Sequence, residues 1–342
     1  MSPSLTSSTD SGSTILSSRS SAASSASTNG CWATLMTGDI YMPGLAVFAH
    51  SLLRGPHASA YPLVVMTVRG SCSAQAIETV RQLGCKVVEV QRMGIPGEAK
   101  QLAQHRFAEV WTKLRAWDLE EYDRVVLVDS DMLVRANMDE LFHVELPKNG
   151  PQGKEGIAAT FACTCNPDKI KTYPATWIPQ NCAFTPQSHP SCLTAPTPLT
   201  ADSPPTYHLL NSGLVVLSPS SSVLIDMAHE IASSPIVQTY RFPDQDFLAR
   251  FYHGSFRPLP YIYNALKKLR QAHPDMWRDE AAKNVHYILK KPWDTRDIGG
   301  VDEETHSWWW QAWEAAQADR AGGVTEENWV NCVQKYVTAL QV

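Results

Sequence analysis

Residues Arg124–Asp131 have the sequence RVVLVDSD, in which four apolar residues lead into two carboxylates. A short, continuous apolar run of this kind is typical of a strand that is buried on both faces. In extended backbone, Asp129 and Asp131 point to the same side because they are two residues apart. Ligands of open α/β sheets bind at the carboxyl ends of the strands. The segment therefore predicts an α/β fold with a candidate site at the end of this strand.

The chain before this strand alternates between short apolar runs and stretches with helical spacing. Strands are predicted at residues 32–37, 63–68 and 86–90, and helices at residues 43–53, 74–83 and 104–117. Alternation of this kind favours a mostly parallel sheet that is flanked by helices. We therefore expect a single Rossmann-like domain.

The pattern loosens after Leu141. Residues 147–206 form a Pro- and Cys-rich insertion around one predicted strand at 156–161. Further strands are predicted at 214–217 and 285–288, and helices at 222–232, 245–252 and 266–271. We expect a disordered Ser-rich tail over residues 1–29, one domain over 30–300, and a helical C-terminal tail over 301–342 that packs on the domain through its Trp residues.

The composition of the 342-residue chain excludes several classes of protein. Hydrophobic residues make up 44%, which excludes a chain that is disordered throughout. Lys and Arg number 29 against 34 Asp and Glu, so there is no basic excess for nucleic acid. No run is apolar enough for a membrane span, and the N-terminus lacks the apolar core of a secretory signal. We expect a cytoplasmic protein, with a homodimer as one option for its assembly.

The residues that could hold a metal are Asp129, Asp131 and His286. Two carboxylates on one side of a strand repel each other unless a cation lies between them, and Mg²⁺ or Mn²⁺ would satisfy that geometry. An imidazole ligand favours Mn²⁺ over Mg²⁺. A strand that simply ends in a turn is the alternative explanation for the acidic pair, and a structural histidine is the alternative for His286. A dehalogenase-like phosphatase would need the acidic motif on an earlier strand.

Three further groups could take part in chemistry. Lys290 and Lys291 follow His286 and could neutralise a diphosphate. Asp244 and Gln245 could contact substrate, although acidic residues here would also suit a helix start. The segment Asn211–Gly213 could hydrogen-bond a sugar hydroxyl, and it would also suit a turn.

Four of the eight cysteines lie in the insertion: Cys163, Cys165, Cys182 and Cys192. Their spacing is not a standard zinc pattern, so two explanations stay open. The four thiolates could form a structural zinc site, or they could be reduced thiols without a metal.

Taken together, the motifs resemble glycosyltransferase family 8, the family of glycogenin and galactinol synthase. In chain order they are Thr34–Thr37 with Tyr41, Thr112–Trp117, Asp129–Asp131, Asn137–Phe142, Asn211–Gly213, Asp244 with Gln245, and His286 with Lys291–Trp293. The segments around Pro243–Leu248 and His273 are more similar to the galactinol synthase branch. The resemblance implies a GT-A fold, a UDP-sugar donor (UDP-glucose or UDP-galactose), Mn²⁺ and a transfer that retains the anomeric configuration. The implied acceptor is a polyol, a sugar or a glycan.

The resemblance also implies roles for individual residues. Those implied to bind the metal are Asp129, Asp131 and His286; those implied to bind the donor are Leu35, Thr37, Tyr41, Lys113, Ser130, Asn211, Ser212, Gly213, Lys290 and Lys291; those implied in catalysis are Asp244, Gln245 and Lys113. Gly38 differs from the Asn that glycogenin-like members have near the uracil. A non-catalytic sugar-nucleotide binding protein and a nucleotide-sugar hydrolase remain alternatives.

Overall fold

The computed structural model describes residues 1, 28–94, 110–296 and 298–340. A seven-stranded sheet with the order β3-β2-β1-β4-β7-β6-β8 forms its centre, and a three-stranded sheet has the order β5-β10-β9. The strands are β1 (Gly30–Met36), β2 (Leu63–Val68), β3 (Lys86–Val90), β4 (Arg124–Val128), β5 (Met132–Val134), β6 (Ile157–Phe161), β7 (Leu210–Leu217), β8 (Phe256–Pro258), β9 (Ala265–Leu266) and β10 (Asn284–His286). In the large sheet β3, β2, β1 and β4 are parallel, and β7 is antiparallel to both β4 and β6.

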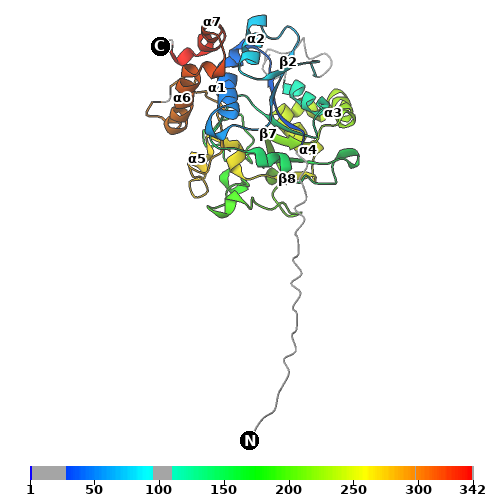
Figure 1. Ribbon diagram of the computed structural model, residues 1–342. Coiled ribbons are helices and arrows are strands. Elements are labelled where there is room, and N and C mark those ends of the chain that lie inside the picture. Colours follow the sequence, from blue (N-terminus) through cyan, green and yellow to red (C-terminus); the bar gives the residue numbers. More distant parts are fainter. Residues whose placement is uncertain (2–27, 95–109, 297, 341–342) are drawn as a thin grey trace.

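Helices cover both faces of the large sheet, which confirms the predicted α/β class (Figure 1). The α-helices are α1 (Met42–Leu53), α2 (Ala74–Gln82), α3 (Ser221–Ser233), α4 (Pro243–Phe251), α5 (Leu269–Ala272), α6 (Glu303–Ala318) and α7 (Glu326–Asn328). The 3-10 helices that matter for the site are η4 (Val110–Asp118), η7 (Pro179–Asn181) and η11 (Tyr261–Asn264).

Alternation along β4 divides the core into two parts. Val126 and Val128 pack into the cluster that contains α1, α2 and α6, whereas Val125 and Leu127 pack into the cluster with η4, α3 and α4. Successive side chains of a strand point to opposite faces, so one continuous apolar run supplies both clusters. This is why the run before Asp129 is apolar at every position.

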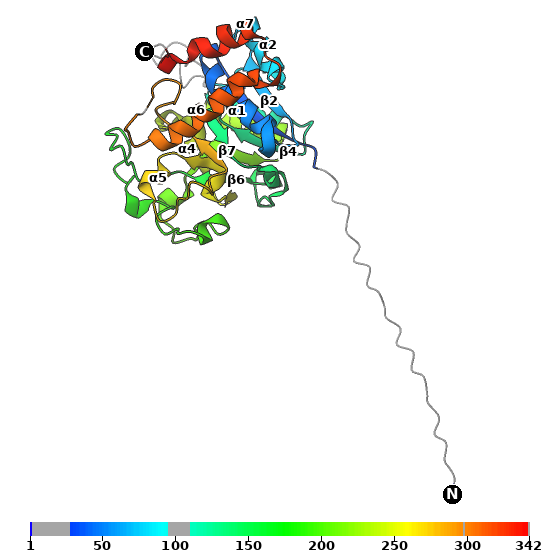
Figure 2. The same ribbon diagram turned by 60° about the vertical axis from the view of Figure 1, so that its left-hand side comes forward.

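The helix α6, in the C-terminal part of the chain, lies against α1 (Figure 2). Trp309, Trp310 and Trp313 are buried in the core at this contact. The rings of Trp309 and Trp313 are stacked with centroids 5.6 Å apart.

Several predicted elements differ from the structure in their bounds, and the predicted helix at 266–271 is replaced by β9 and the shorter α5. β7 begins at Leu210, four residues before the predicted strand, because Asn211–Gly213 are themselves extended and paired. The predicted helix at 104–117 appears as η4 from Val110, and residues 104–109 lie outside the described part of the chain. Strands β5, β8 and β9 have only two or three residues, too few for a periodic pattern.

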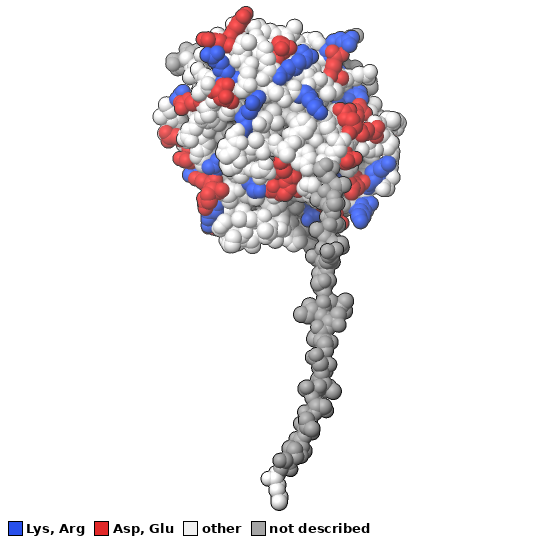
Figure 3. Space-filling model, in the orientation of Figure 1, with Lys and Arg blue, Asp and Glu red and all other residues white. Residues whose placement is uncertain are grey.

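The surface carries interspersed charges. On the face shown in Figure 3, Lys and Arg alternate with Asp and Glu without a large patch of one sign. Within the described ranges, no helix is both long enough and apolar enough to cross a membrane.

Candidate active site

The predicted metal ligands come together at the carboxyl edge of β4. Asp129 and Asp131 directly follow β4, and His286 is the last residue of β10. His286 Nε2 lies 3.2 Å from Asp131 Oδ1 and 3.7 Å from Asp129 Oδ2. The three side chains can therefore offer one ligand atom each to a single ion.

Asn264 fixes the orientation and tautomer of the His286 ring. The amide nitrogen of Asn264 donates to Asn211 Oδ1 at 2.8 Å and to Thr160 Oγ1 at 3.1 Å. Its oxygen therefore faces His286 Nδ1, 2.9 Å away, and accepts a hydrogen bond from the N–H of that nitrogen. This leaves the lone pair of Nε2 directed at the carboxylates, as a metal ligand requires.

Gly213 on β7 allows the His286 ring to reach this position. A Cβ atom at residue 213 would lie 2.4 Å from His286 Cε1 and 2.6 Å from His286 Nδ1. Any larger side chain would therefore collide with the imidazole. The Asn-Ser-Gly segment thus contributes space to the site as well as polar groups.

Lys113 lies between Asp129, which follows β4, and Asp244 of α4. Its ammonium lies 2.6 Å from Asp129 Oδ1 and 3.4 Å from Asp244 Oδ2, and donates to the Ser212 carbonyl at 2.7 Å. Burial lowers the pKa of Lys113, but the two carboxylates outweigh burial and raise it. Lys113 is therefore a permanent buried cation between two carboxylates.

Asp131 forms an ion pair with Lys291. Burial alone would raise the pKa of Asp131, but the Lys291 ammonium outweighs that effect and holds the pKa well below its usual range. Asp131 is therefore an anion at every pH at which the protein would work.

Asp244 and Gln245 begin α4 and face β7. Ser212 Oγ donates to Asp244 Oδ2 at 2.8 Å, and Asn211 Nδ2 donates to Gln245 Oε1 at 3.1 Å. Pro243 at the helix start provides a fixed backbone angle there, and Asp244 complements the helix dipole. One network therefore joins Asp244 and Gln245 to the Asn-Ser-Gly segment.

The other residues predicted to bind the sugar-nucleotide donor lie around this network rather than within it. Leu35 lies near the end of β1, and Thr37 and Tyr41 follow the strand, at the same edge of the sheet as Asp129. Ser130 is half-buried between the two carboxylates. Lys290 is exposed and its backbone carbonyl accepts from Lys267, whereas the side chain of Lys291 pairs with Asp131.

Sequence reasoning missed Asn264 as a member of this site. No local signal marks it, because it lies in η11 and reaches His286 only through the fold.

The Asn137–Phe142 motif has a structural role. Its Asp139 accepts hydrogen bonds from Ser59 Oγ and, at 2.8 Å, from the Ala60 amide, so it anchors a loop.

The donor set suits a divalent cation of the Mn²⁺ type. Two carboxylates supply hard oxygen ligands, and the oriented imidazole supplies a nitrogen. The Nε2 lone pair and the two carboxylate oxygens repel one another. A cation between them would attract all three groups and remove the repulsion. The three residues therefore fit the metal that the sequence suggests.

Known proteins resemble this chain over most of its length. The sequence model described as "Glycosyl transferase family 8" matches residues 34–297. Galactinol synthase 1 of Ajuga reptans is 28% identical over 277 residues, which cover 79% of this chain and 76% of that protein. Galactinol synthase 2 of the same plant is 32% identical over 235 residues, which cover 68% of this chain and 73% of that protein.

Solved glycosyltransferase structures share the fold. The apo form of GlyE from Streptococcus pneumoniae TIGR4 superposes with a TM-score of 0.54 and 14% identity, covering 85% of this chain and 63% of that chain. The apo bifunctional glycosyltransferase WbbM gives a TM-score of 0.51 at 17% identity, covering 85% of this chain and 52% of that chain. These similarities support the GT-A architecture.

Proposed function

The chain belongs to glycosyl transferase family 8 and is a glycosyltransferase, and on that premise we propose the finer details of its reaction. We propose that it transfers a hexose from a UDP-sugar to an acceptor hydroxyl with retention of configuration, using Mn²⁺. The relatives are galactinol synthases by name, which favours UDP-galactose as the first donor to test, with UDP-glucose next. The acceptor class that we propose is a polyol, a sugar or a glycan.

The convergence of Asp129, Asp131 and His286 carries the proposal. These residues come from two separate sheets and meet with their ligand atoms within 4.8 Å of one another. Lys113 and Lys291 stand beside the same carboxylates. A cation site with two fixed lysines suits a ligand that carries several negative charges, such as a nucleoside diphosphate.

The lysines would act on the leaving group. Cleavage of the bond between sugar and diphosphate builds negative charge on the departing oxygen, and a metal held by the three ligands would stabilise that charge. Lys291 would move from Asp131 towards the phosphates and add a positive charge at the same place. Lys113 is held by three partners and would provide a fixed charge near the donor.

Asp244 and Gln245 would act on the sugar. Asp244 accepts from Ser212 and lies near Lys113, so its carboxylate is fixed and can accept from sugar hydroxyls. Gln245 would lie near the anomeric carbon. An amide is a poor nucleophile, so we propose front-face attack by the acceptor hydroxyl with the departing phosphate as base. Asp244 as a covalent nucleophile is the alternative.

A thermal-shift screen tests the donor site. The purified protein is melted with uridine, adenosine and guanosine diphosphates, each with and without Mn²⁺. A ligand at 100 times its dissociation constant adds about 2.7 kcal/mol to the free energy of unfolding. We expect UDP to raise the melting temperature only when Mn²⁺ is present, and His286→Ala to remove that shift.

Assays of the same protein with UDP-galactose and UDP-glucose, with and without an acceptor, separate the remaining alternatives. UDP release without an acceptor product would indicate a nucleotide-sugar hydrolase, and binding without turnover would indicate a non-catalytic binding protein. A location in the cytoplasm and assembly as a homodimer stay predictions, which imaging of the tagged protein and light scattering would check.

A further inference from the structure

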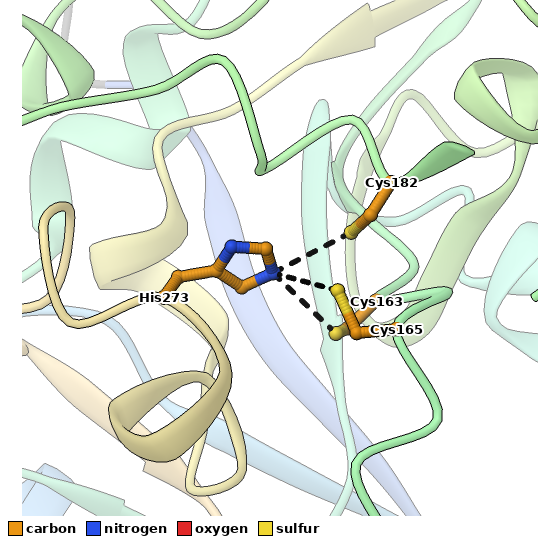
Figure 4. A group of neighbouring side chains, drawn as sticks. All are labelled: Cys163, Cys165, Cys182 and His273. Carbon is orange, nitrogen blue, oxygen red and sulfur yellow. Dashed lines mark hydrogen bonds between the residues drawn. The ribbon is translucent and has the colours of Figure 1, made fainter. Parts of the chain in front are cut away.

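Three cysteines and one histidine form a second cluster, apart from the candidate active site. Cys163 and Cys165 follow β6, Cys182 follows η7, and His273 follows α5. All three sulfur atoms surround His273 Nε2, as Figure 4 shows, at 3.8 Å from Cys163, 3.2 Å from Cys165 and 3.5 Å from Cys182. The three cysteines belong to the insertion, whereas His273 lies far from them in the sequence.

The three nitrogen–sulfur distances fit a tetrahedral metal site. With Zn–S bonds of about 2.3 Å and a Zn–N bond of about 2.05 Å, a regular tetrahedron has nitrogen–sulfur edges of about 3.5 Å. The three observed distances lie on both sides of that value. The four atoms lie within 4.8 Å of one another, so one ion could contact all of them.

Burial and ligand chemistry both favour zinc. Cys182 is fully buried, and Cys165 and His273 are 8% and 7% exposed. Three thiolates with one imidazole form a soft tetrahedral donor set, which selects zinc over Mg²⁺ or Mn²⁺. Four protein ligands leave no open position, which is the pattern of a structural site rather than a catalytic one.

The identity of the fourth ligand corrects the sequence prediction. That prediction grouped Cys192 with the other three thiols, but Cys192 Sγ points to the Met276 carbonyl at 3.7 Å. His273 takes the fourth position instead. It lies far along the chain from the insertion, so cysteine spacing alone could not reveal it.

We propose that Cys163, Cys165, Cys182 and His273 bind one structural Zn²⁺ ion. Binding requires thiolates, so the thiols release their protons as the metal enters. The ion would join the insertion to the segment after β9. Other contacts between the same two segments are a Lys268–Asp168 ion pair at 3.1 Å and a hydrogen bond from the His189 amide to the Asp275 carbonyl at 3.2 Å.

This cluster is also connected to the candidate active site through Thr160 and Asn264. Thr160, three residues before Cys163, accepts from Asn264, and Asn264 holds His286. Asn264 also directly precedes β9, and β9 leads through α5 to His273. The zinc would therefore fix both chain segments that carry the Asn264 network.

Metal analysis of the wild-type protein is the primary test and needs no variant. Protein purified without chelators is measured by inductively coupled plasma mass spectrometry. We expect about one zinc per chain, which persists after gel filtration with EDTA and is released when a mercurial reagent blocks the thiols. Protein that contains no zinc, and takes up none when refolded with it, would overturn the proposal.

Two matched variants assign the ligands. Cys182→Ser should lose the zinc, whereas Cys192→Ser, in the same insertion, should keep it. Zinc retained by Cys182→Ser, or lost only in Cys192→Ser, would contradict the assignment. If Cys182→Ser fails to fold, Co²⁺ substitution of the wild-type protein decides: intense thiolate-to-cobalt absorption supports the site, and its absence opposes it.

Intact mass spectrometry under native conditions distinguishes a disulfide. A mass that is two hydrogens below the reduced chain, with no zinc, would show one disulfide among the eight cysteines. A peptide map that places this disulfide between two of Cys163, Cys165 and Cys182 would overturn the proposal. Neither result depends on glycosyltransferase activity, so this inference can fail while the proposed function stands.

Discussion

His286 depends on two neighbours, one that leaves room for its ring and one that holds it. Gly213 leaves the room, since a Cβ there would lie 2.4 Å from the ring. Asn264 holds the ring through Nδ1. Neither residue contacts the metal in the proposed mechanism, yet both decide where the Nε2 lone pair points.

Gly213→Ala should displace the imidazole and weaken Mn²⁺ binding by more than about 10-fold, as the loss of an outer partner does. Isothermal titration with Mn²⁺ measures this affinity. Gly38→Ala is the matched control because no atom lies within 4 Å of the position its Cβ would take. Equal affinity in the two variants would contradict the steric argument.

Asn264→Ala should weaken Mn²⁺ binding by about 10- to 100-fold, because the ring loses its fixed tautomer and orientation. Electron paramagnetic resonance of free and bound Mn²⁺ measures the change. The exposed Asn149, which donates to the Gly254 carbonyl, provides the control Asn149→Ala. Unchanged affinity in Asn264→Ala would show that the Asn264 contact does not position His286.

Among the helices and strands, those that have a clear local sequence pattern could be predicted. β2 and β3 have their predicted bounds because each is a short segment rich in valine, a residue that favours strands. β7 is longer than predicted because its first residues are polar and serve the site. The short strand β9 and the helix η11 bring Asn264 to His286, and no local pattern marks such a contact.

The helix α6 offers a direct comparison of adjacent tryptophans. Trp309 is fully buried, whereas Trp308 is half-buried and lies over the Arg135 guanidinium at 3.9 Å. Trp309→Ala should lower the free energy of unfolding by about 3–5 kcal/mol through the cavity it leaves. Trp308→Ala should cost only about 1 kcal/mol.

Urea unfolding followed by circular dichroism measures both tryptophan variants. Similar losses in the two would mean that α6 is not seated on α1 as described, and the contact between these helices would need revision.

For the whole molecule, acid should weaken the contact between α6 and the core. Asp302 pairs with Lys267 Nζ at 2.8 Å and Lys268 Nζ at 3.2 Å. Burial would raise the pKa of Asp302, but the lysines outweigh it and lower the pKa. A carboxyl with a lowered folded-state pKa stabilises the fold above its unfolded pKa of about 4, and this contribution is lost as pH falls through the folded pKa.

Asp302→Asn should therefore lower the free energy of unfolding at pH 7 by roughly 3 kcal/mol, the lower end for a broken buried pair. The variant should also lose less stability than the wild type between about pH 5 and pH 2. Unfolding curves across that range check both points, and parallel pH profiles for the two proteins would contradict the assignment.

The overall architecture could be predicted from the sequence, because short apolar runs that alternate with helical stretches are typical of a parallel sheet covered by helices. The grouping of Asp129, Asp131 and His286 could also be predicted, since acidic residues at a strand end and a histidine after another apolar run are visible locally. The cysteine–histidine cluster could be predicted only in part: its three cysteines are close in the sequence, whereas His273 joins them through tertiary packing.

The most direct test of the central claim is transfer from UDP-[¹⁴C]galactose and UDP-[¹⁴C]glucose to a panel of polyols and sugars, by the wild type and by Asp131→Asn. The account predicts a product with retained anomeric configuration, formed only with Mn²⁺. It predicts a rate lower by more than about 100-fold in Asp131→Asn, with the circular dichroism spectrum of the folded protein retained. Asp118→Asn, which alters an exposed partner of Arg115, should match the wild type. Full transfer by Asp131→Asn, or by wild-type protein freed of Mn²⁺, would contradict the account.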